Sequence, residues 1–280
     1  MQADSGFGFE FEFVPVDGLT LRCRVEGPEG APWLLLSNSL MTDLTLWDAQ
    51  VATWGDRFRI LRYDQRGHGG SGLAPAPVTL DRLVEDALAL LDHFRIDAAV
   101  VAGVSMGAAT ALGLAGRHPG RVLGVLASDG QARTAPGGAA SWQERIAFAR
   151  DKGMRAVVQA TVARWFRPGF VERNDVDFQR AVAMMTDTSL DGYVACATAL
   201  TQYDFEAELP AIRVPVLLVA GAQDGAMPAS MRALRDRIPG AQFAEIAESG
   251  HLPNLEQAAA FNAATKTFLT QFVGPGRTRP

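Results

Sequence analysis

The residues of this chain best suited to chemistry are a serine, an acid and a histidine that occur in that order. Ser105 is the centre of Gly103-Val104-Ser105-Met106-Gly107, a G-x-S-x-G pattern between an apolar run and an Ala-rich helical segment. A sharp strand-to-helix turn of this kind holds a serine hydroxyl clear of the sheet edge, and its glycines avoid clashes within the turn. The pattern therefore predicts that Ser105 is a nucleophile.

A serine hydroxyl needs a base to take its proton, and the chain has only four histidines to supply one. His93 and His118 lie on or at the end of predicted helices, and His68 lies in a Gly-rich turn. His251 follows the last predicted strand, at the sheet edge where Ser105 is expected, and in the order serine, acid, histidine that such a fold requires. We therefore predict that His251 is the base.

The acid has two candidates, Asp224 and Asp129. Both follow predicted strands, and both precede His251 in the chain. Gly225 and Pro228 give Asp224 the turn context expected of a loop that aims a carboxylate at the histidine. We favour Asp224, with Asp129 as the alternative; in the other interpretation Asp129 caps a helix or closes a loop by hydrogen bonding.

The composition restricts the kind of protein and the kind of partner. The chain has 280 residues, 48% of them hydrophobic, with a formal net charge of −5. A mildly acidic chain argues against a nucleic-acid partner, and no apolar run is long enough to span a membrane. The first eight residues do not resemble a signal peptide, so we expect a cytoplasmic location. Cys23 and Cys196 are predicted to be unpaired, and no residue spacing indicates a metal site.

The predicted elements alternate between strands and helices after an antiparallel start. Continuous apolar runs are typical of strands covered on both faces. Strands are predicted at 9–16, 20–26, 33–37, 59–63, 98–102, 122–127, 214–220 and 242–246, and helices at 80–94, 106–117 and 257–272. This order predicts an α/β protein with a mostly parallel eight-stranded sheet flanked by helices.

One stretch, 131–208, interrupts the alternation. It contains four predicted helices, at 141–152, 154–166, 175–185 and 190–201, and no convincing strand. Open α/β sheets bind ligands at the carboxyl ends of their strands. We therefore expect a helical cap at 131–208, inserted after the sixth strand, over a core formed by 1–130 and 209–280.

These features together resemble the α/β-hydrolase fold, and within it the 3-oxoadipate enol-lactonases. The resemblance covers nearly the whole chain. Its motifs are Ser37-Asn38-Ser39-Leu40 before Trp47-Asp48, the turn from Asp64 to Ser71, the pentapeptide around Ser105, Arg164-Trp165-Phe166, Gly221-Ala222-Gln223-Asp224, and Gly250-His251-Leu252-Pro253. It implies Ser105, Asp224 and His251 as a catalytic triad, and a small ester or lactone as substrate, with no cofactor or metal.

The resemblance also implies an oxyanion hole formed by the backbone N–H groups of Met106 and Leu40. Two converging backbone donors can stabilise an oxyanion whatever their side chains. Asn38 either orients the loop before Leu40 or is an ordinary loop residue. Arg66, in the turn from Asp64 to Ser71, either contacts substrate or holds that turn by hydrogen bonds.

An enol-lactone of 3-oxoadipate carries a free carboxylate, so its pocket needs a cation. Arg133, at the entrance to the cap, is the predicted candidate, and a solvated surface arginine is the alternative. Trp142 and Trp165 are predicted to line the pocket, or else to pack within the cap. The stretch 128–133, which should face substrate, departs from the small-residue sequence usual in the family and puts the exact substrate in question.

Three other functions share these residues. A general carboxylesterase or perhydrolase would have an apolar pocket, and a carbon–carbon bond hydrolase would use the same fold and triad. A small-molecule receptor on a hydrolase fold would not need catalysis, and the presence of all three catalytic residue types in order disfavours it.

Overall fold

The computed structural model describes residues 11–74 and 77–273, and within them the strands form one eight-stranded sheet. The strand order is β1-β2-β4-β3-β5-β6-β7-β8. The strands are β1 (Glu12–Val16), β2 (Leu19–Glu26), β3 (Trp33–Ser37), β4 (Arg59–Tyr63), β5 (Ala99–Val104), β6 (Val122–Ser128), β7 (Val216–Gly221) and β8 (Gln242–Ile246).

The sheet is mostly parallel, as predicted. Only β2 runs antiparallel to its neighbours, β1 on one side and β4 on the other. All six residues of β5 and all six of β7 are buried, which explains why these central strands read as unbroken apolar runs. The first predicted strand began at residue 9, and residues 9 and 10 lie outside the described residues, as does the segment 1–8 considered for a signal peptide.

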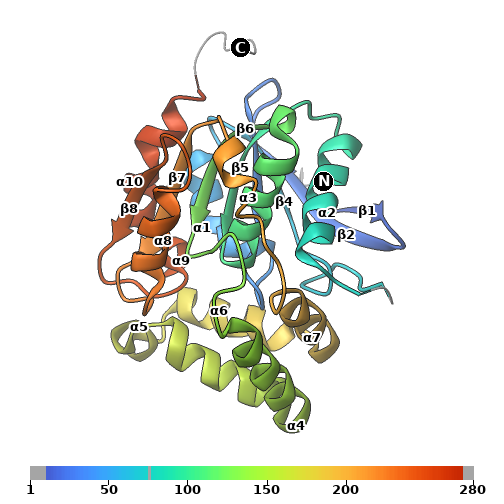
Figure 1. Ribbon diagram of the computed structural model, residues 1–280, viewed down its shortest axis with the longest axis vertical. Coiled ribbons are helices and arrows are strands. Elements are labelled where there is room, and N and C mark those ends of the chain that lie inside the picture. Colours follow the sequence, from blue (N-terminus) through green and yellow to red (C-terminus); the bar gives the residue numbers. More distant parts are fainter. Residues whose placement is uncertain (1–10, 75–76, 274–280) are drawn as a thin grey trace, which may run out of the picture.

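Helices flank the sheet and also gather at one end of it (Figure 1). Helix α2 packs beside α3, which contacts β3, β5 and β6, and α1 packs beside α10. The helices are α1 (Asp48–Trp54), α2 (Leu80–His93), α3 (Met106–Arg117), α4 (Gly138–Trp165), α5 (Pro168–Arg173), α6 (Val176–Asp187), α7 (Leu190–Ala199), α8 (Met227–Arg235), α9 (Pro253–Glu256) and α10 (Ala258–Thr270), with 3₁₀ turns at Leu44–Trp47, Pro119–Arg121 and Leu209–Ala211.

The helical cap predicted after the sixth strand consists of α4 to α7, which lie together below the sheet in Figure 1. Helix α4 is broken at Gly153, whose φ of 76° and ψ of 171° are not helical. Glycine adopts positive φ without the steric penalty that other residues incur. The break at Gly153 therefore allows the two halves of α4 to run in different directions over the same end of the sheet.

Two helices of the core, α1 and α8, were not predicted, and neither was the four-residue helix α9. Helix α1 has only seven residues and buries only Gln50 and Trp54, so it shows little apolar periodicity. Helix α8 contains Pro228 in its first turn, and we had interpreted this proline as a turn signal. A proline is tolerated in the first helical turn because the amide it lacks would have no partner in the helix.

Both cysteines are buried and free, as predicted. Over the described part of the chain, no helix combines the length and apolar character needed to cross a membrane.

Candidate active site

Ser105 lies at the junction of β5 and α3 in a strained backbone conformation. Its φ is 55° and its ψ is −111°, and its N–H donates a 2.8 Å hydrogen bond to the carbonyl of Ser128 at the end of β6. A Cβ on Gly103 would lie 2.1 Å from the carbonyl oxygen of Gly107, and one on Gly107 would lie 2.2 Å from that of Ser37. Only glycine fits at these two positions, so the pentapeptide sequence enforces the tight turn that presents the serine.

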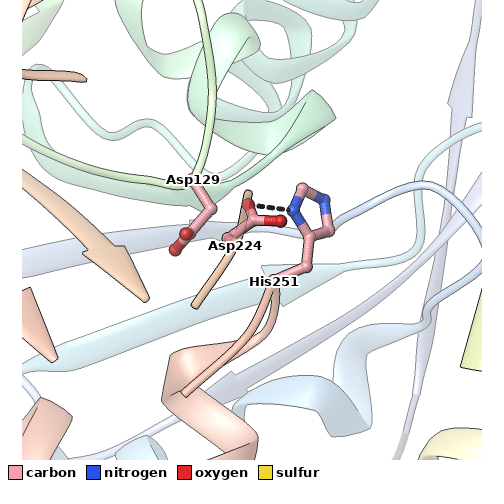
Figure 2. Close-up of side chains that lie close together, drawn as sticks. All are labelled: Asp129, Asp224 and His251. Carbon is pink, nitrogen blue, oxygen red and sulfur yellow. Dashed lines mark hydrogen bonds and ion pairs between the residues drawn. The ribbon is translucent and has the colours of Figure 1, made fainter. Parts of the chain in front are cut away.

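Asp224 and His251 form a hydrogen-bonded pair, shown in Figure 2. Asp224 Oδ2 lies 2.7 Å from His251 Nδ1, the first on the loop after β7 and the second on the loop after β8. Burial opposes ionisation of Asp224, but the charge of His251 and this hydrogen bond outweigh it and lower the pKa of Asp224. A carboxylate bonded to Nδ1 leaves Nε2 as the nitrogen that can accept a proton.

Ser105 and His251 face one cavity of about 280 Å³ between the sheet and the cap. Leu40 and Met106 line the same cavity. Among the described residues no hydrogen bond joins the Ser105 hydroxyl to His251, although both face this space. Such bonds often tighten only when substrate is present. The cavity is small by the standard of ligand sites, so it suits a small acyl group.

The two predicted oxyanion donors belong to Met106 and Leu40, which line the cavity with Ser105. Met106 is the first residue of α3, so its N–H has no acceptor within its own helix. Leu40 follows β3 on a loop held by buried polar contacts. Asn38, in that loop, is fully buried, and its side-chain Nδ2 donates to the backbone carbonyl of Tyr63 at 2.7 Å. The backbone carbonyl of Asn38 accepts a hydrogen bond from Gln65 Nε2 at 2.6 Å. Asn38 is therefore placed to hold the loop and does not line the cavity.

Trp165 connects the cap to the histidine, a contact that the sequence did not indicate. Its ring centroid lies 4.8 Å from that of His251. Its carbonyl oxygen accepts a 2.8 Å hydrogen bond from the His251 N–H. A Cβ on Gly250 would lie 2.0 Å from that oxygen, so glycine before the histidine permits this close approach. The end of α4 thus helps to position His251.

The predicted cation, Arg133, lines the cavity but already has an acidic partner. Its Nε lies 3.3 Å from Oε1 of Glu206, and 45% of its side chain is exposed. Two other arginines, Arg145 and Arg164, line the same cavity, and neither was among the predicted site residues. Within the described residues, neither of these two is paired with a carboxylate in an ion pair.

Arg145 and Arg164 come from opposite halves of α4, on either side of Gly153. The guanidinium carbon of Arg145 stands 4.6 Å from the ring centroid of Trp142, which also lines the cavity. Arg164 has exposed surface, yet burial of the rest of the group lowers its pKa, and the charge of Arg145 lowers it further. The two positive charges repel each other, and a bound anion between them would relieve this repulsion.

The turn after β4 is stabilised by buried charge. Arg66 has no exposed surface and donates from Nε to Asp86 at 2.6 Å. Its side chain therefore holds the turn from Asp64 to Ser71 and is directed away from the cavity. His68 in the same turn is buried, and burial lowers its pKa to about 4.

Asp129 also lies beside the Asp224–His251 pair. Asp129, Asp224 and His251 each offer one ligand atom, and these atoms all lie within 4.8 Å of one another. A metal here would have to compete for the Nδ1 of His251, which already pairs with Asp224. The arrangement therefore fits a hydrogen-bonded catalytic triad better than it fits a metal centre.

A serine on a strand-to-helix turn shares a cavity with an aspartate–histidine pair under a helical cap, and this arrangement is typical of hydrolases with an α/β fold. Residues 31–264 match the sequence model of the alpha/beta hydrolase family. The chain therefore belongs to this family.

Its relatives include lactonases and esterases. The chain is 36% identical to 3-oxoadipate enol-lactonase 2 of Acinetobacter baylyi over 247 residues, which cover 88% of this chain and 91% of that protein. The crystal structure of an enol-lactonase from Burkholderia xenovorans is 37% identical, with a TM-score of 0.88, and the match covers 92% of this chain and 100% of that one. An esterase from Thermogutta terrifontis is 26% identical, with a TM-score of 0.85, over 94% of this chain and 98% of the other. This chain is an enzyme of the ester and lactone hydrolase class.

Proposed function

We propose that this protein opens a small anionic enol-lactone through an acyl-enzyme on Ser105. The observation that carries the proposal is the 2.7 Å bond between Asp224 and His251 Nδ1 in the cavity that Ser105 also faces. A histidine held in this tautomer is a base only at Nε2, and the serine hydroxyl is the nucleophile available to it.

In the first half of the reaction, Ser105 Oγ bonds to the lactone carbonyl carbon while His251 Nε2 takes the hydroxyl proton. The oxyanion that forms accepts hydrogen bonds from the backbone N–H groups of Met106 and Leu40. The carbonyl then re-forms and the ring C–O bond breaks. The ring oxygen receives the proton from His251 and leaves as an enol that is still attached to the acyl group.

In the second half, His251 takes a proton from water, whose oxygen bonds to the acyl carbon. The bond to Ser105 Oγ then breaks, and the serine regains its proton from His251. The product is a carboxylic acid whose enol converts to the ketone. Throughout, Asp224 balances the charge of the imidazolium. No group outside the protein and water is needed for these proton transfers.

The arginines of the cap support an anionic substrate. Arg145 and Arg164 face the cavity without a carboxylate partner among the described residues, whereas Arg133 pairs with Glu206. Arginine is well suited to carboxylate because its N–H groups match both oxygens. The enol-lactone of 3-oxoadipate combines a reactive lactone with a free carboxylate, so we propose it as the substrate and aromatic catabolism as the setting. We assign the carboxylate to Arg145 and Arg164 in place of Arg133.

Covalent labelling and a substrate panel test the proposal together. Wild-type enzyme should react with a fluorophosphonate, and the Ser105→Ala variant should not. The panel compares an enol-lactone that carries a carboxylate, a neutral lactone and a short aryl ester. We expect kcat/KM to be highest for the anionic lactone. Folded wild-type enzyme that resists labelling would refute the serine mechanism, and a preference for the neutral aryl ester would refute the anionic substrate.

A further inference from the structure

A second buried carboxyl, that of Asp129, lies beside the catalytic pair and has no role in the mechanism above. Asp129 follows β6, has no exposed surface, and adopts a φ of 48°. Its backbone N–H donates to the carbonyl of Val219 in β7 at 2.9 Å. The residue is therefore fixed between the ends of β6 and β7, next to the loop that carries Asp224.

Two donors hold the Asp129 carboxyl group in place. The N–H of Gly221, the last residue of β7, donates to Oδ1 at 2.8 Å, and the hydroxyl of Ser128 donates to Oδ2 at 2.6 Å. In addition, one carboxyl oxygen of Asp129 lies within 4.8 Å of one of Asp224. Figure 2 shows Asp129 on the side of Asp224 opposite to the histidine ring.

The charged groups around Asp129 do not include a cation bound to it. Asp224 faces it from the loop after β7, and His251, from the loop after β8, is engaged by Asp224. Arg164 of the cap acts on the charge of Asp224. Over residues 11–74 and 77–273, no arginine, lysine or histidine forms an ion pair with Asp129.

Two carboxylates this close, in a buried place, do not both stay ionised. Burial raises the pKa of Asp129 and the charge of Asp224 raises it further, whereas the pKa of Asp224 is lowered through its contact with His251. Of the two groups, Asp129 is therefore the one that takes up a proton first. A proton on Asp129 would make it a donor toward Asp224, because two carboxylates offer only acceptors.

We propose that Asp129 is a positioning residue that stays a neutral carboxylic acid and donates a hydrogen bond to the carboxylate of Asp224. The proposal rests on the proposed function of the Asp224–His251 pair. The neutral acid holds the Asp224 carboxylate in the orientation that His251 needs. It also keeps the negative charge beside the histidine at one unit.

Infrared difference spectroscopy tests the protonation state without any reference to activity. The spectrum of wild type minus that of Asp129→Asn, taken at neutral pH, should contain the carbonyl band of a protonated carboxylic acid. Asparagine tolerates positive φ and keeps both an acceptor and a donor, so this variant should preserve the fold. A difference spectrum with only carboxylate bands would overturn the proposal.

The pH profile of kcat/KM gives the second test. The low-pH limb reports the protonation of His251. If Asp129 is neutral, Asp129→Asn should leave the pKa of that limb within about 0.3 unit and kcat/KM within about threefold of wild type, because neither the charge nor the donor is lost. If Asp129 were ionised, removing its charge so close to His251 should lower that pKa by more than about one unit, and this result would also overturn the proposal.

Asp129→Leu tests the positioning role in enzyme that is shown to be folded. It removes the donor toward Asp224 together with the acceptors for Gly221 and Ser128, and we expect kcat to fall at least about 10- to 100-fold with KM little changed. Full activity in folded Asp129→Leu enzyme would contradict the positioning role. If wild type neither labels nor hydrolyses any member of the panel, the proposed function fails, and the infrared result still decides the state of Asp129.

Discussion

Removal of the unpaired charges from the cap should abolish the preference for an anionic substrate and leave the chemistry intact. Arg145 and Arg164 face the cavity from the two halves of α4, and neither touches the Asp224–His251 pair through a recorded bond. A hydrogen bond to a charged group contributes about 1.5–3 kcal/mol. Since Arg164 has exposed surface, where solvent weakens such interactions, the lower value applies to each arginine.

At about 1.4 kcal/mol for each tenfold change, Arg145→Met and Arg164→Met should each lower kcat/KM for the anionic lactone about tenfold. The double variant should lower it about 100-fold, chiefly through KM, if the two contributions add. For a neutral lactone, kcat/KM should fall much less, because that substrate has no carboxylate for the arginines to bind and only the effect of Arg164 on the charge of Asp224 is lost. The measurement is the ratio of kcat/KM for the anionic lactone to kcat/KM for the neutral lactone, taken from steady-state kinetics.

The matched control is Arg133→Met, which also removes a cation from the cavity wall. Because Arg133 is paired with Glu206, we expect a change of less than about threefold in the same ratio. Added salt should reduce the wild-type preference for the anionic lactone and should have little effect on the double variant. A double variant that keeps the wild-type ratio, or an Arg133→Met variant that loses it, would refute our assignment of the carboxylate site.

Two further predictions concern the triad and the turn that presents the serine. Asp224→Asn should lower kcat by about 10³- to 10⁴-fold on every substrate of the panel, because an amide favours the wrong histidine tautomer, and rapid kinetics that show less than a tenfold loss would contradict the acid assignment. Gly107→Ala should destabilise the fold by about 2–3 kcal/mol in chemical denaturation, since its Cβ would lie 2.2 Å from the Ser37 carbonyl oxygen. Gly169→Ala, where a Cβ would meet nothing within 4 Å, is its control, and equal denaturation midpoints for the two variants would contradict this reasoning.

The strands of the sheet and their alternation with helices along the chain were predictable because their signals are local. Each central strand is a continuous apolar run, and the strand–turn–helix around Ser105 occupies consecutive residues, so a short window contains all the information. The missed helices α1 and α8 lack this advantage. Helix α1 buries few side chains, and the proline in the first turn of α8 resembles a turn signal.

The cap shows where sequence reasoning reached its limit. The predicted helices 141–152 and 154–166 meet at Gly153, but the sequence does not reveal that Arg145 and Arg164 then face one cavity. Their separation along the chain hides the proximity, which depends on the angle between the halves of α4. Arg133 was chosen because it stands at the cap entrance, and its partner Glu206 comes from a distant part of the sequence.

The sequence by itself was enough to predict Ser105 as the nucleophile and His251 as the base. Ser105 follows from a pattern of five consecutive residues, and His251 from its place after the last strand and the scarcity of histidines. The sequence favoured Asp224 over Asp129 only by its turn context, because both follow strands of the same sheet, and only the tertiary structure shows which of them contacts His251. The packing of the loops after β7 and β8 brings Asp224 to 2.7 Å from His251 and leaves Asp129 hydrogen-bonded to Ser128 and Gly221. Differences of a few ångströms decide which carboxyl contacts the histidine, and spacing along the chain does not record them.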